Sequence, residues 1–478
     1  MRPAMRMFNA ATPSAVLLLL AGCAVGPNYQ APPVALTSGF HAAPVSAAGP
    51  VAPLETWWTA FNDPGLERVI ARVQAQNLDI AQAAARVSQS RAAAKAAGAA
   101  LLPSLQGQAG ISRTRQSLQS PIGEIGQHLP GFERDYNLYE AGAAASWEID
   151  LFGGLRRERE AALADAKVTA DRAQAVRVSM MAEAADSYLT ARGLQARLAV
   201  ARRQEAVQKD LADLLQRQVG EGLAPERELH EAQAALQDVR ASIPPLTAAL
   251  SAQFNRLDVL MGAQPGTWRA ELEIVSPIPA PPSMAAAEGP AGLLRRRPDV
   301  LAAEQRLVAS NARIGAAVSN YYPKVSLAGL FGGQSIDSRT VFAAGALQSQ
   351  IGVGLRWRLF DFGRVDAEVA AARGKQAEDL AAYRLVVLRA AEEVENAFTD
   401  LAQQQARAGT LAQEVDHLNI ARAQAQQAYE GGVISLVEVR DVDRSLLTAS
   451  DQLAQAQAGA ARAAVAGFRA LGGGWNVS

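Results

Sequence analysis

A long run without proline, from Leu155 to Val219, constrains this chain more than any other feature of its sequence. The run has one glycine, Gly193, and consists largely of Ala, Arg, Gln, Glu and Leu, which are good helix formers. As a single α-helix it would be about 97 Å long. Residues 138–152 before it read as a strand closed by Gly153-Gly154. A strand that leads directly into a helix many times longer than the average of about three turns requires a special architecture.

The same arrangement occurs a second time. A strand-like stretch at 351–362 is followed by Gly363 and by a proline-free run over 365–430. Matching residues recur at a separation of 210: Trp147 and Trp357, Gly222 and Gly432, Glu228 and Glu438, Leu236 and Leu446, and Gly262 and Gly472. Two further pairs are 220 apart: Asp79 and Asp299, and Pro103 and Pro323. The sequence therefore predicts two repeats of helix, strand, strand, long helix, turn and helix, with a longer loop between the strands of the first.

The chain begins with a segment typical of export. Residues 1–22 combine a basic start with an apolar stretch, and Leu20-Ala21-Gly22-Cys23 resembles a bacterial lipobox. We expect cleavage after residue 22 and a covalent lipid on Cys23; the alternative is an ordinary signal peptide followed by a spare cysteine. Ala24 rather than aspartate follows, which by resemblance to such lipoproteins suggests the outer membrane. Because Cys23 is the only cysteine, an intramolecular disulfide is excluded.

The remaining composition excludes several classes of protein. A formal net charge of −1 gives no electrostatic footprint for nucleic acid. No apolar run long enough for a membrane-spanning helix follows the signal segment, so any membrane crossing would be made by strands. Residues 23–65 are expected to be a lipid-anchored, extended segment, in which Trp57, Trp58 and Phe61 form a small satellite core. From Leu66 to Leu102 the pattern is helical, and Pro103 ends it.

Four strands are predicted, at about 104–114, 138–149, 324–334 and 349–360. In the last one Ile351, Val353 and Leu355 alternate with glycine and arginine, which is the pattern of a strand with one apolar and one polar face. A half-buried soluble sheet is the alternative. Open sheet edges are not tolerated in lipid and the smallest membrane barrels have about 8 strands, so we expect oligomerisation. Three copies would give a 12-stranded barrel with pseudo-sixfold symmetry.

The long helices carry apolar residues at intervals of seven, which is typical of coiled coils. These residues are Val200, Val207 and Leu214 in the first copy and Val387, Val394 and Leu401 in the second. Glycine-containing turns follow at 220–226 and 431–436 and reverse the chain into return helices. Pro244-Pro245 is expected to end the first return helix at residue 243. We expect the short helices to stack end to end beside the long ones, and 24–65, 262–297 and 471–478 to form a belt around them.

Several stretches resemble the outer-membrane efflux protein family, in the lipoprotein branch of its TolC-like factors. They are CAVGPNYQAPP (23–33), WWTAFNDPGL (57–66), SWEIDLFGG (146–154), RRRPDVLAAEQRL (295–307), NARIGAAVSNYYPKVSL (311–327), LFDFGR (359–364) and ALGGGW (470–475). The resemblance implies a trimer in which a 12-stranded outer-membrane barrel continues into a helical periplasmic tunnel with an equatorial belt. It divides the mature chain into a first repeat at 66–265, a linker at 266–297 and a second repeat at 298–478.

The resemblance also implies partners and sites. A periplasmic adaptor protein and an inner-membrane transporter of the resistance-nodulation-division type would complete a tripartite pump. The family docks its adaptor and closes its tunnel at the helical turns, which here contain Gly220, Gly222, Leu223, Gly431, Gly432, Val433 and Ser435. Family tunnels often carry an acidic ring above the tip, but residues 419–429 contain no acid. The candidate constriction is therefore Asp416, Tyr429 and Glu430.

No constellation of residues indicates an enzyme. His41, His128, His230 and His417 are scattered without zinc-ligand spacing, and Gly220-x-Gly222 lacks the third glycine of a dinucleotide loop. No metal or other cofactor is expected besides the lipid. The sequence favours a passive exit duct for drugs and other toxic small molecules, a function associated with antibiotic resistance. An exit duct for type I protein secretion and a lipid-anchored coiled-coil spacer without a pore remain as alternatives.

Overall fold

The computed structural model describes residues 24–42, 53–284 and 289–476. The signal segment 1–22 and the expected lipidation site Cys23 lie outside the described residues. In chain order the elements are η1 (Leu54–Phe61), α2 (Pro64–Gln76), α3 (Leu78–Ala99), β1 (Ser104–Arg115), α4 (Pro121–Gly126), β2 (Asp135–Ile149), α5 (Gly154–Gly220), α6 (Glu226–Leu260), α7 (Arg269–Leu272), α8 (Gly289–Arg296), α9 (Pro298–Val318), η2 (Ser319–Tyr321), β3 (Lys324–Ser335), η3 (Ala344–Ala346), β4 (Leu347–Arg356), α10 (Arg364–Glu430) and α11 (Leu436–Ala470).

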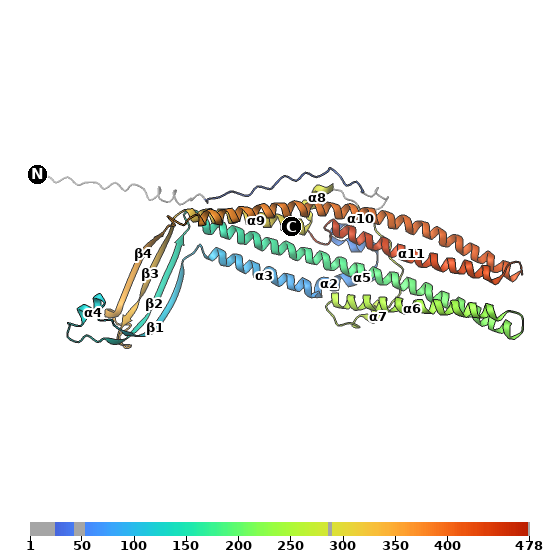
Figure 1. Cartoon of the computed structure of the whole chain (residues 1–478), viewed down its shortest axis with the longest axis horizontal. Helices are drawn as coiled ribbons and strands as arrows, with labels where there is room; N and C mark the ends of the chain where they lie inside the picture. The colour runs from blue at the N-terminus through green and yellow to red at the C-terminus, as the bar shows by residue number, and fades with distance from the viewer. Residues whose placement is uncertain (1–23, 43–52, 285–288, 477–478) are drawn as a thin grey trace. The chain divides into compact units, whose positions relative to one another are not determined.

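The second half of the chain repeats the elements of the first. The long helices α5 and α10 have 67 residues each, and the return helices α6 and α11 have 35 each. The first residues of α5 and α10, and those of α6 and α11, are offset by the same separation as the repeated sequence positions. In each repeat a long helix and its return helix form an antiparallel hairpin (Figure 1).

Two compact units divide the described residues. One contains the residues up to Pro32 together with Ser88–Lys167 and Gln305–Ala381, and includes the sheet. The other contains Pro33–Val87, Val168–Glu304 and Ala382 onward, and includes the two helical hairpins. No helix in the part of the chain that the structure describes is long and apolar enough to cross a membrane.

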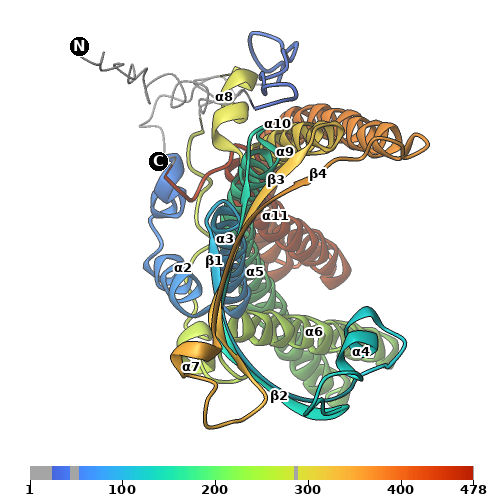
Figure 2. The ribbon, with the colours of Figure 1, turned by 90° about the vertical axis from the view of Figure 1, so that its left-hand side faces the viewer.

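The four strands form one antiparallel sheet in the order β1-β2-β3-β4, which Figure 2 shows as a curved layer. Their positions agree with the sequence pattern except that β4 ends at Arg356, before the predicted residue 360. The strand stops there because the chain turns into α10, where the Asp361 carboxylate accepts hydrogen bonds from the amides of Gly363 (3.1 Å) and Val365 (2.9 Å). Since β1 and β4 are the outer strands, each leaves one edge without a partner.

Asn77 interrupts the helix that the sequence predicts over 66–102, so this part of the prediction is wrong. Its backbone is extended between α2 and α3. Its Oδ1 accepts hydrogen bonds from the amides of Asp79 (2.9 Å) and Ile80 (3.0 Å), which caps the start of α3. Its Nδ2 donates a hydrogen bond of 2.9 Å to the carbonyl of Leu260, which is the last residue of α6. The side chain therefore stabilises the break and attaches it to the end of another helix.

This hydrogen bond joins the end of α6 to the start of α3, so the two helices stack end to end as expected. Arg297, the counterpart of Asn77 in the second repeat, reproduces it by donating from Nη1 to the carbonyl of Ala470 at the end of α11 (3.0 Å). Hence α11 meets the start of α9 as α6 meets the start of α3. At about 1.5 Å per residue, α6 and α3 together measure about 85 Å and α5 about 100 Å, so two short helices cover most of one long helix.

Helix α6 continues through Pro244 and Pro245 to Leu260, and the expected end at residue 243 is wrong. Two prolines remove the amide donors for the carbonyls of Arg240 and Ala241. Both prolines are exposed on the helix surface, where water can satisfy those carbonyls. Packing of the remaining α6 residues, such as Phe254 and Leu257, holds the helix together beyond the defect.

The heptad pattern is correct for one long helix and displaced in the other. Val387, Val394 and Leu401 of α10 are buried, as expected. In α5 the predicted residues Val200, Val207 and Leu214 are only half-buried. The buried stripe lies beside them, at Ala201, Gln204, Gln208, Ala212 and Leu215. Alanine on this stripe lets the neighbouring helix approach closely, which buries the stripe rather than the larger side chains next to it.

Trp57 and Phe61 belong to the main core and not to a satellite cluster, which corrects the sequence interpretation. Trp57 is 1% exposed and stacks on Phe468 of α11 with ring centroids 5.4 Å apart. Tyr188 of α5 fixes the neighbouring helix start by donating its hydroxyl hydrogen to Asp63 Oδ1 (2.8 Å), the residue that caps α2. Burial raises the pKa of Tyr188 well above its usual value, so the phenol remains a hydrogen-bond donor.

A prediction follows from the prolines of α6. The second repeat carries Ala454 and Gln455 at the corresponding positions. We expect the double variant Pro244→Ala/Pro245→Gln to raise the midpoint of thermal unfolding, measured by circular dichroism, because an interior proline costs a helix about 3 kcal/mol. The reciprocal variant Ala454→Pro/Gln455→Pro should lower it. A lower midpoint for the first variant would mean that the surrounding packing requires a bend at this position.

Candidate functional site

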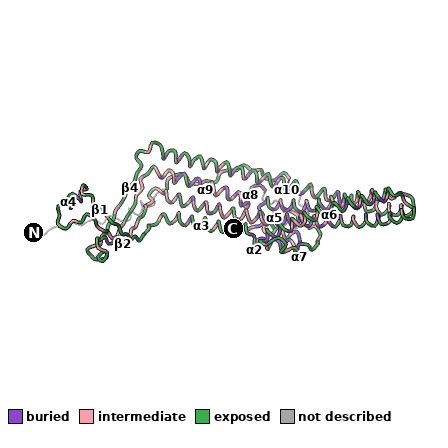
Figure 3. Tube along the Cα trace, turned by 60° about the horizontal axis from the view of Figure 1, so that its bottom comes forward, coloured by how far each residue is buried: buried purple, intermediate pink, exposed green. Residues whose placement is uncertain are grey.

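The register of the sheet divides its side chains into two faces of opposite character. Residues that pair across antiparallel strands project to the same side, and the side alternates along each strand. We call the face that carries Trp147 the apolar face. Its large apolar members are Leu105, Ile111, Tyr139, Trp147, Leu327, Phe331, Leu347, Ile351, Val353 and Leu355, and two arginines, Arg113 and Arg115, lie on it at the end of β1 far from Trp147. Leu105 is 75% exposed and Ile351 85% exposed, so this face has no cover within the described part of the chain (Figure 3).

The opposite face is mostly polar, with Tyr136, Leu138 and Leu330 as its large apolar exceptions. It carries Gln106, Gln108, Ser112, Glu140, Ser146, Glu148, Lys324, Ser326, Gln334, Gln348, Gln350 and Arg356. Contacts between strands confirm the shared side, since Ser104 Oγ lies 2.9 Å from Ser146 Oγ and the Gln334 amide donates to Glu140. An exposed sheet with an apolar and a polar face fits a wall between lipid and water.

Two tryptophans mark the same end of the sheet in both repeats. Trp147 of β2 donates from Nε1 to the carbonyl of Leu101 at 2.9 Å. Trp357, just beyond β4, donates in the same way to the carbonyl of Tyr321 at 2.9 Å. Both rings stay partly exposed, at 38% and 52%. Tryptophans with a satisfied N–H and an exposed ring are typical of the membrane–water interface.

The turns of the two helical hairpins have nearly identical backbone geometry. Gly222 and Gly432 have φ angles of 71° and 73°. Each donates its N–H to the carbonyl three residues earlier, and the next residue donates to the carbonyl five residues earlier. This is the Schellman ending of a helix, which requires a left-handed residue and therefore favours glycine. An added Cβ would meet open space at both positions, so only the backbone angle restricts the residue type.

All seven predicted tip residues are accessible. Gly220, Gly222, Gly431, Gly432 and Ser435 are exposed, and the side chains of Leu223 and Val433 are 73% and 79% exposed. Both turns lie at the same end of their hairpins (Figure 1). The hairpins touch near the turns, where Leu436 of α11 packs against an apolar cluster of the first hairpin: Ala212, Leu215, Leu229, Ala232 and Leu236. The tip therefore presents two bare apolar side chains on a fixed backbone.

The candidate constriction residues do not come together within one chain. Asp416 is exposed on α10, and Glu430 accepts a hydrogen bond from Gln426 Nε2 at 2.8 Å. Tyr429 is half-buried, and its carbonyl accepts the N–H of Gly432. Their role in a constriction stays a prediction.

Two ion pairs that the sequence analysis missed cross the hairpins. Arg240 of α6 contacts Glu205 of α5 at 2.9 Å, and Arg422 of α10 contacts Asp443 of α11 at 2.6 Å. In each pair the two residues are about equally far along the chain from the turn, and the midpoints of their residue numbers are 222.5 and 432.5. An arginine and an acid at equal separations from a turn glycine are the sequence signal that would have predicted these pairs. The second pair is the less exposed, because the Asp443 side chain is only 8% accessible.

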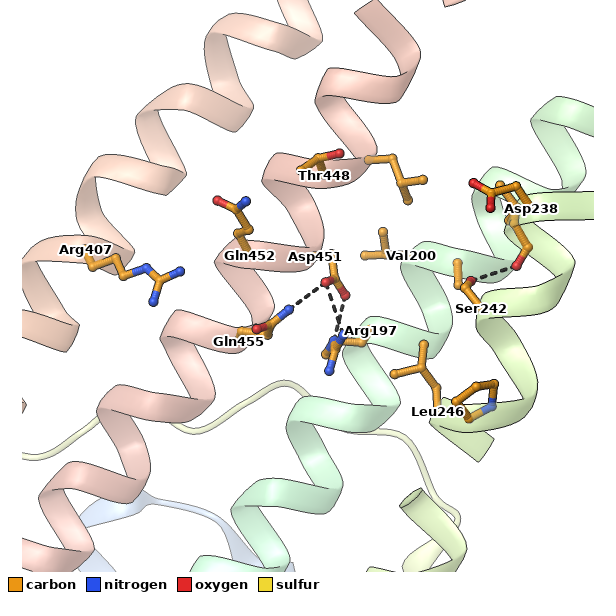
Figure 4. Close-up of a pocket in the computed structure, with 14 residues that line it drawn as sticks. Arg197, Val200, Asp238, Ser242, Leu246, Arg407, Thr448, Asp451, Gln452 and Gln455 are labelled. Carbon is orange, nitrogen blue, oxygen red and sulfur yellow. Dashed lines mark hydrogen bonds and ion pairs between the residues drawn. The ribbon is translucent and has the colours of Figure 1, made fainter. Parts of the chain in front are cut away.

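A groove of about 630 Å³ separates the hairpins farther from the turns (Figure 4). Arg197 of α5 holds Asp451 of α11 with two hydrogen bonds, at 2.7 and 3.2 Å, and Gln455 donates to the same carboxylate at 2.6 Å. Ser242 and Leu246 line the opposite wall beside the prolines of α6. No group of His, Cys, Asp or Glu among the described residues could hold a metal ion.

Comparison with known proteins gives one consistent result. The sequence model of the outer membrane efflux protein family matches residues 69–263 and 290–473. The chain is 31% identical over 434 residues to the pyoverdine export outer membrane protein OpmQ of Pseudomonas putida, covering 91% of each protein. It is 28% identical over 484 residues to the toluene efflux pump outer membrane protein TtgF of the same species, covering 97% of each.

Solved structures agree in fold. The outer-membrane channel OprN superposes with a TM-score of 0.83 at 31% identity, covering 95% of this chain and 100% of that one. The MtrE outer membrane channel of Neisseria gonorrhoeae, solved in an open state, gives a TM-score of 0.82 at 24% identity, with 95% and 99% covered.

The buried ion pair of the second hairpin generates a prediction. Replacing Arg422 with glutamine leaves the Asp443 carboxylate buried with a weaker partner, which costs about 1–3 kcal/mol. We expect faster amide hydrogen exchange across residues 419–446. Arg240→Gln is the matched control, because its ion pair is 42% and 33% exposed and should contribute at most about 1 kcal/mol. Equal exchange in the two variants would show that Arg422 does not fasten its hairpin.

Proposed function

Because the chain belongs to the outer membrane efflux protein family, we propose that it forms the exit duct of a tripartite efflux pump. The two-faced sheet is the observation that carries this proposal. Its exposed apolar face suits lipid and its polar face suits a water-filled passage. The family is one of outer-membrane channels rather than of enzymes, and the duct conducts passively while its partners supply energy.

Closure of the duct follows from the unpaired edges of β1 and β4. Every backbone N–H and C=O in lipid needs a partner, so an open edge there is costly. Pairing β1 of one chain with β4 of the next satisfies both edges. Three chains then form a 12-stranded barrel, and their helices form a tunnel in the periplasm with η1, α7, α8 and the C-terminal residues as a belt.

The exposed tip is the proposed docking point for the other pump components. Leu223 and Val433 present exposed apolar side chains on turns whose backbone the glycines fix. Such a surface suits a partner that binds a small apolar patch. A periplasmic adaptor docks there and connects the duct to an inner-membrane transporter of the resistance-nodulation-division type. Asp416, Tyr429 and Glu430 line the constriction near the same end, and the cargo consists of drugs and other toxic small molecules.

A covalent lipid on Cys23 anchors the mature chain in the outer membrane. The described chain begins at the next residue, and the N–H of Val25 donates to the carbonyl of Phe152 at 3.1 Å, between β2 and α5. The first described residues therefore lie near the Trp147 end of the sheet. This is the position that an anchor in the periplasmic leaflet requires.

Conductance tests the duct against a spacer without a pore. We expect the purified protein to run as three chains in native mass spectrometry in detergent and to open stable conducting pores in planar bilayers. A stable monomer with intact β-structure would contradict the closure argument, and a trimer without conductance would favour the spacer. Loss of small-molecule export in a deletion strain, with protein secretion unchanged, separates efflux from type I secretion.

The tip glycines provide a test of docking. We expect Gly222→Trp and Gly432→Trp to leave the trimer and its outer-membrane location unchanged, but to impair drug resistance and adaptor cross-linking in a complemented deletion strain. The bulky ring obstructs a docking partner, whereas the Gly→Ala controls add only the strain of a left-handed backbone, about 1 kcal/mol. Normal resistance in both tryptophan variants would remove the tip from docking. Loss of the trimer would make the glycines folding determinants.

Lipidation is tested by labelling with palmitate. Wild type should incorporate the label, and Cys23→Ser should not, because no other cysteine is present. We expect the variant to keep part of its efflux function, since the barrel itself holds the protein in the membrane. Equal label in both proteins would exclude lipidation of Cys23.

A further inference from the structure

A groove between α3 and α5 has no role in the function described so far. It has a volume of about 650 Å³, within the range of small-molecule sites. Its walls are Arg91, Ala94, Lys95, Gly98, Ala99, Leu101 and Leu102 of α3 and the residues after it, and Arg159, Leu163 and Ala166 of α5. The two helices run side by side in Figures 1 and 3. The lining thus combines an apolar floor with three cations.

The three cations have no partner among the described residues. The structure gives Arg91, Lys95 and Arg159 no hydrogen bond or ion pair within those ranges, and all three are exposed. Two acids of α5 near the groove pair with other arginines, Glu160 with Arg157 at 2.8 Å and Asp165 with Arg313. Glu158 is exposed and makes no contact with the three cations in the described part of the chain. Three unpaired cations around one groove favour an anionic ligand.

The apolar floor continues into the apolar face of the sheet. Leu102 and Leu163 are 66% and 46% exposed, so the groove offers apolar surface to a ligand. The carbonyl of Leu101 accepts the N–H of Trp147, which lies on the apolar face, and Leu105 follows on the same face of β1. Arg91 and Lys95 lie further along α3 from the sheet than Leu101 and Leu102. A ligand with its anion at the lysine and arginines would therefore direct its apolar part toward the lipid-facing surface.

The second repeat closes the corresponding groove. With the two offsets between the repeats, Gly98 becomes Val318, Leu101 and Leu102 become Tyr321 and Tyr322, and Arg159 becomes Val369. Tyr322 stacks on Phe152 with ring centroids 4.6 Å apart, and the Tyr321 hydroxyl donates to Asp366. Lys95 corresponds to Gly315, whose place beside Arg157 leaves no room for a side chain. Leu163 becomes Arg373, so the second repeat carries one cation at a lining position, but the set of three cations is peculiar to the first repeat.

We propose that this groove binds one anionic glycerophospholipid from the periplasmic leaflet of the outer membrane. The phosphate contacts Arg91, Lys95 and Arg159, and an acyl chain lies against Gly98, Leu102 and Leu163. The trimer carries three such lipids, one per first repeat, at the level where the sheet meets the helices. The proposal rests on the proposed outer-membrane position of the sheet.

Native mass spectrometry of the detergent-purified trimer, titrated with defined lipids, tests the site. We expect up to three bound phosphatidylglycerol molecules per trimer and weaker retention of phosphatidylethanolamine, whose headgroup has no net charge. The variant Arg91→Gln/Lys95→Gln/Arg159→Gln should bind phosphatidylglycerol about tenfold more weakly, as expected for the loss of charge-assisted contacts. Gly98→Val/Leu102→Tyr, which installs two side chains of the second repeat, should block binding while keeping every charge.

The matched control removes three exposed cations that do not line the groove, one on α3 and two on α10: Arg86→Gln/Arg384→Gln/Arg389→Gln. It should bind as wild type does. If the control loses as much phosphatidylglycerol binding as the groove variant, the loss reflects net charge rather than the groove. If wild type binds both lipids equally, the groove has no anion site. Either result overturns the proposal. Displacement of the lipid by inorganic phosphate alone would also overturn it, because the acyl chain would then contribute nothing. Binding only to dissociated monomers would overturn it as well, by identifying the groove as a subunit interface.

Conductance of the same preparations separates this proposal from the proposed function. The two groove variants should conduct as wild type does. Conducting trimers without lipid preference would refute the lipid site alone, whereas a wild-type protein that neither trimerises nor conducts would refute the duct.

Discussion

The need of backbone hydrogen-bonding groups for partners underlies the organisation of this chain. A four-stranded sheet satisfies its inner strands but leaves one edge of β1 and one edge of β4 open. In water such edges are tolerable, but beside lipid they are not. The exposed apolar face suits a sheet that lies beside lipid. In that position a single chain would leave two sheet edges unpaired. Repetition within the chain raises the number of strands from two to four, and the assembly proposed above would supply partners for the two edges that remain.

Helix stacking lets two short helices together cover most of the length of one long helix. One continuous helix, α5 or α10, runs beside two shorter ones in each repeat, and the joint between the short helices has to satisfy their free ends. Asn77 and Arg297 occupy equivalent joints and bond to the last carbonyls of α6 and α11. The two side chains differ in chemistry, yet each supplies a donor at the same place. What the repeats share is the position of the hydrogen bond rather than the residue that makes it.

The sequence predicted those features of the fold that depend on residues close together along the chain. The lack of proline bounded α5 and α10 to within a residue or so, and the period-2 pattern located the strands, because propensity and alternation act along the chain. The break at Asn77 could not be read in this way, since its second partner lies 183 residues away. Continuity of α6 through Pro244 and Pro245 depends on packing that outweighs a local penalty. The groove beside α3 depends on which faces of α3 and α5 meet, which no window of sequence contains, whereas the spacing of Arg422 and Asp443 about their turn was a signal that the sequence did carry.

The two hairpins are alike in length and turn, but they are fastened near the turn by different forces. Leucine and alanine contacts, such as Leu215 with Leu229, hold the first hairpin, whereas Arg422 and Asp443 hold the second. Apolar contacts persist as ionic strength rises, and a largely buried ion pair is screened by salt much less than an exposed one. Near its turn the first hairpin therefore depends on side-chain packing, and the second depends on one arginine and one buried carboxylate. Within one chain the two turns can therefore respond differently to the same substitution, because removing one charge loosens only the second.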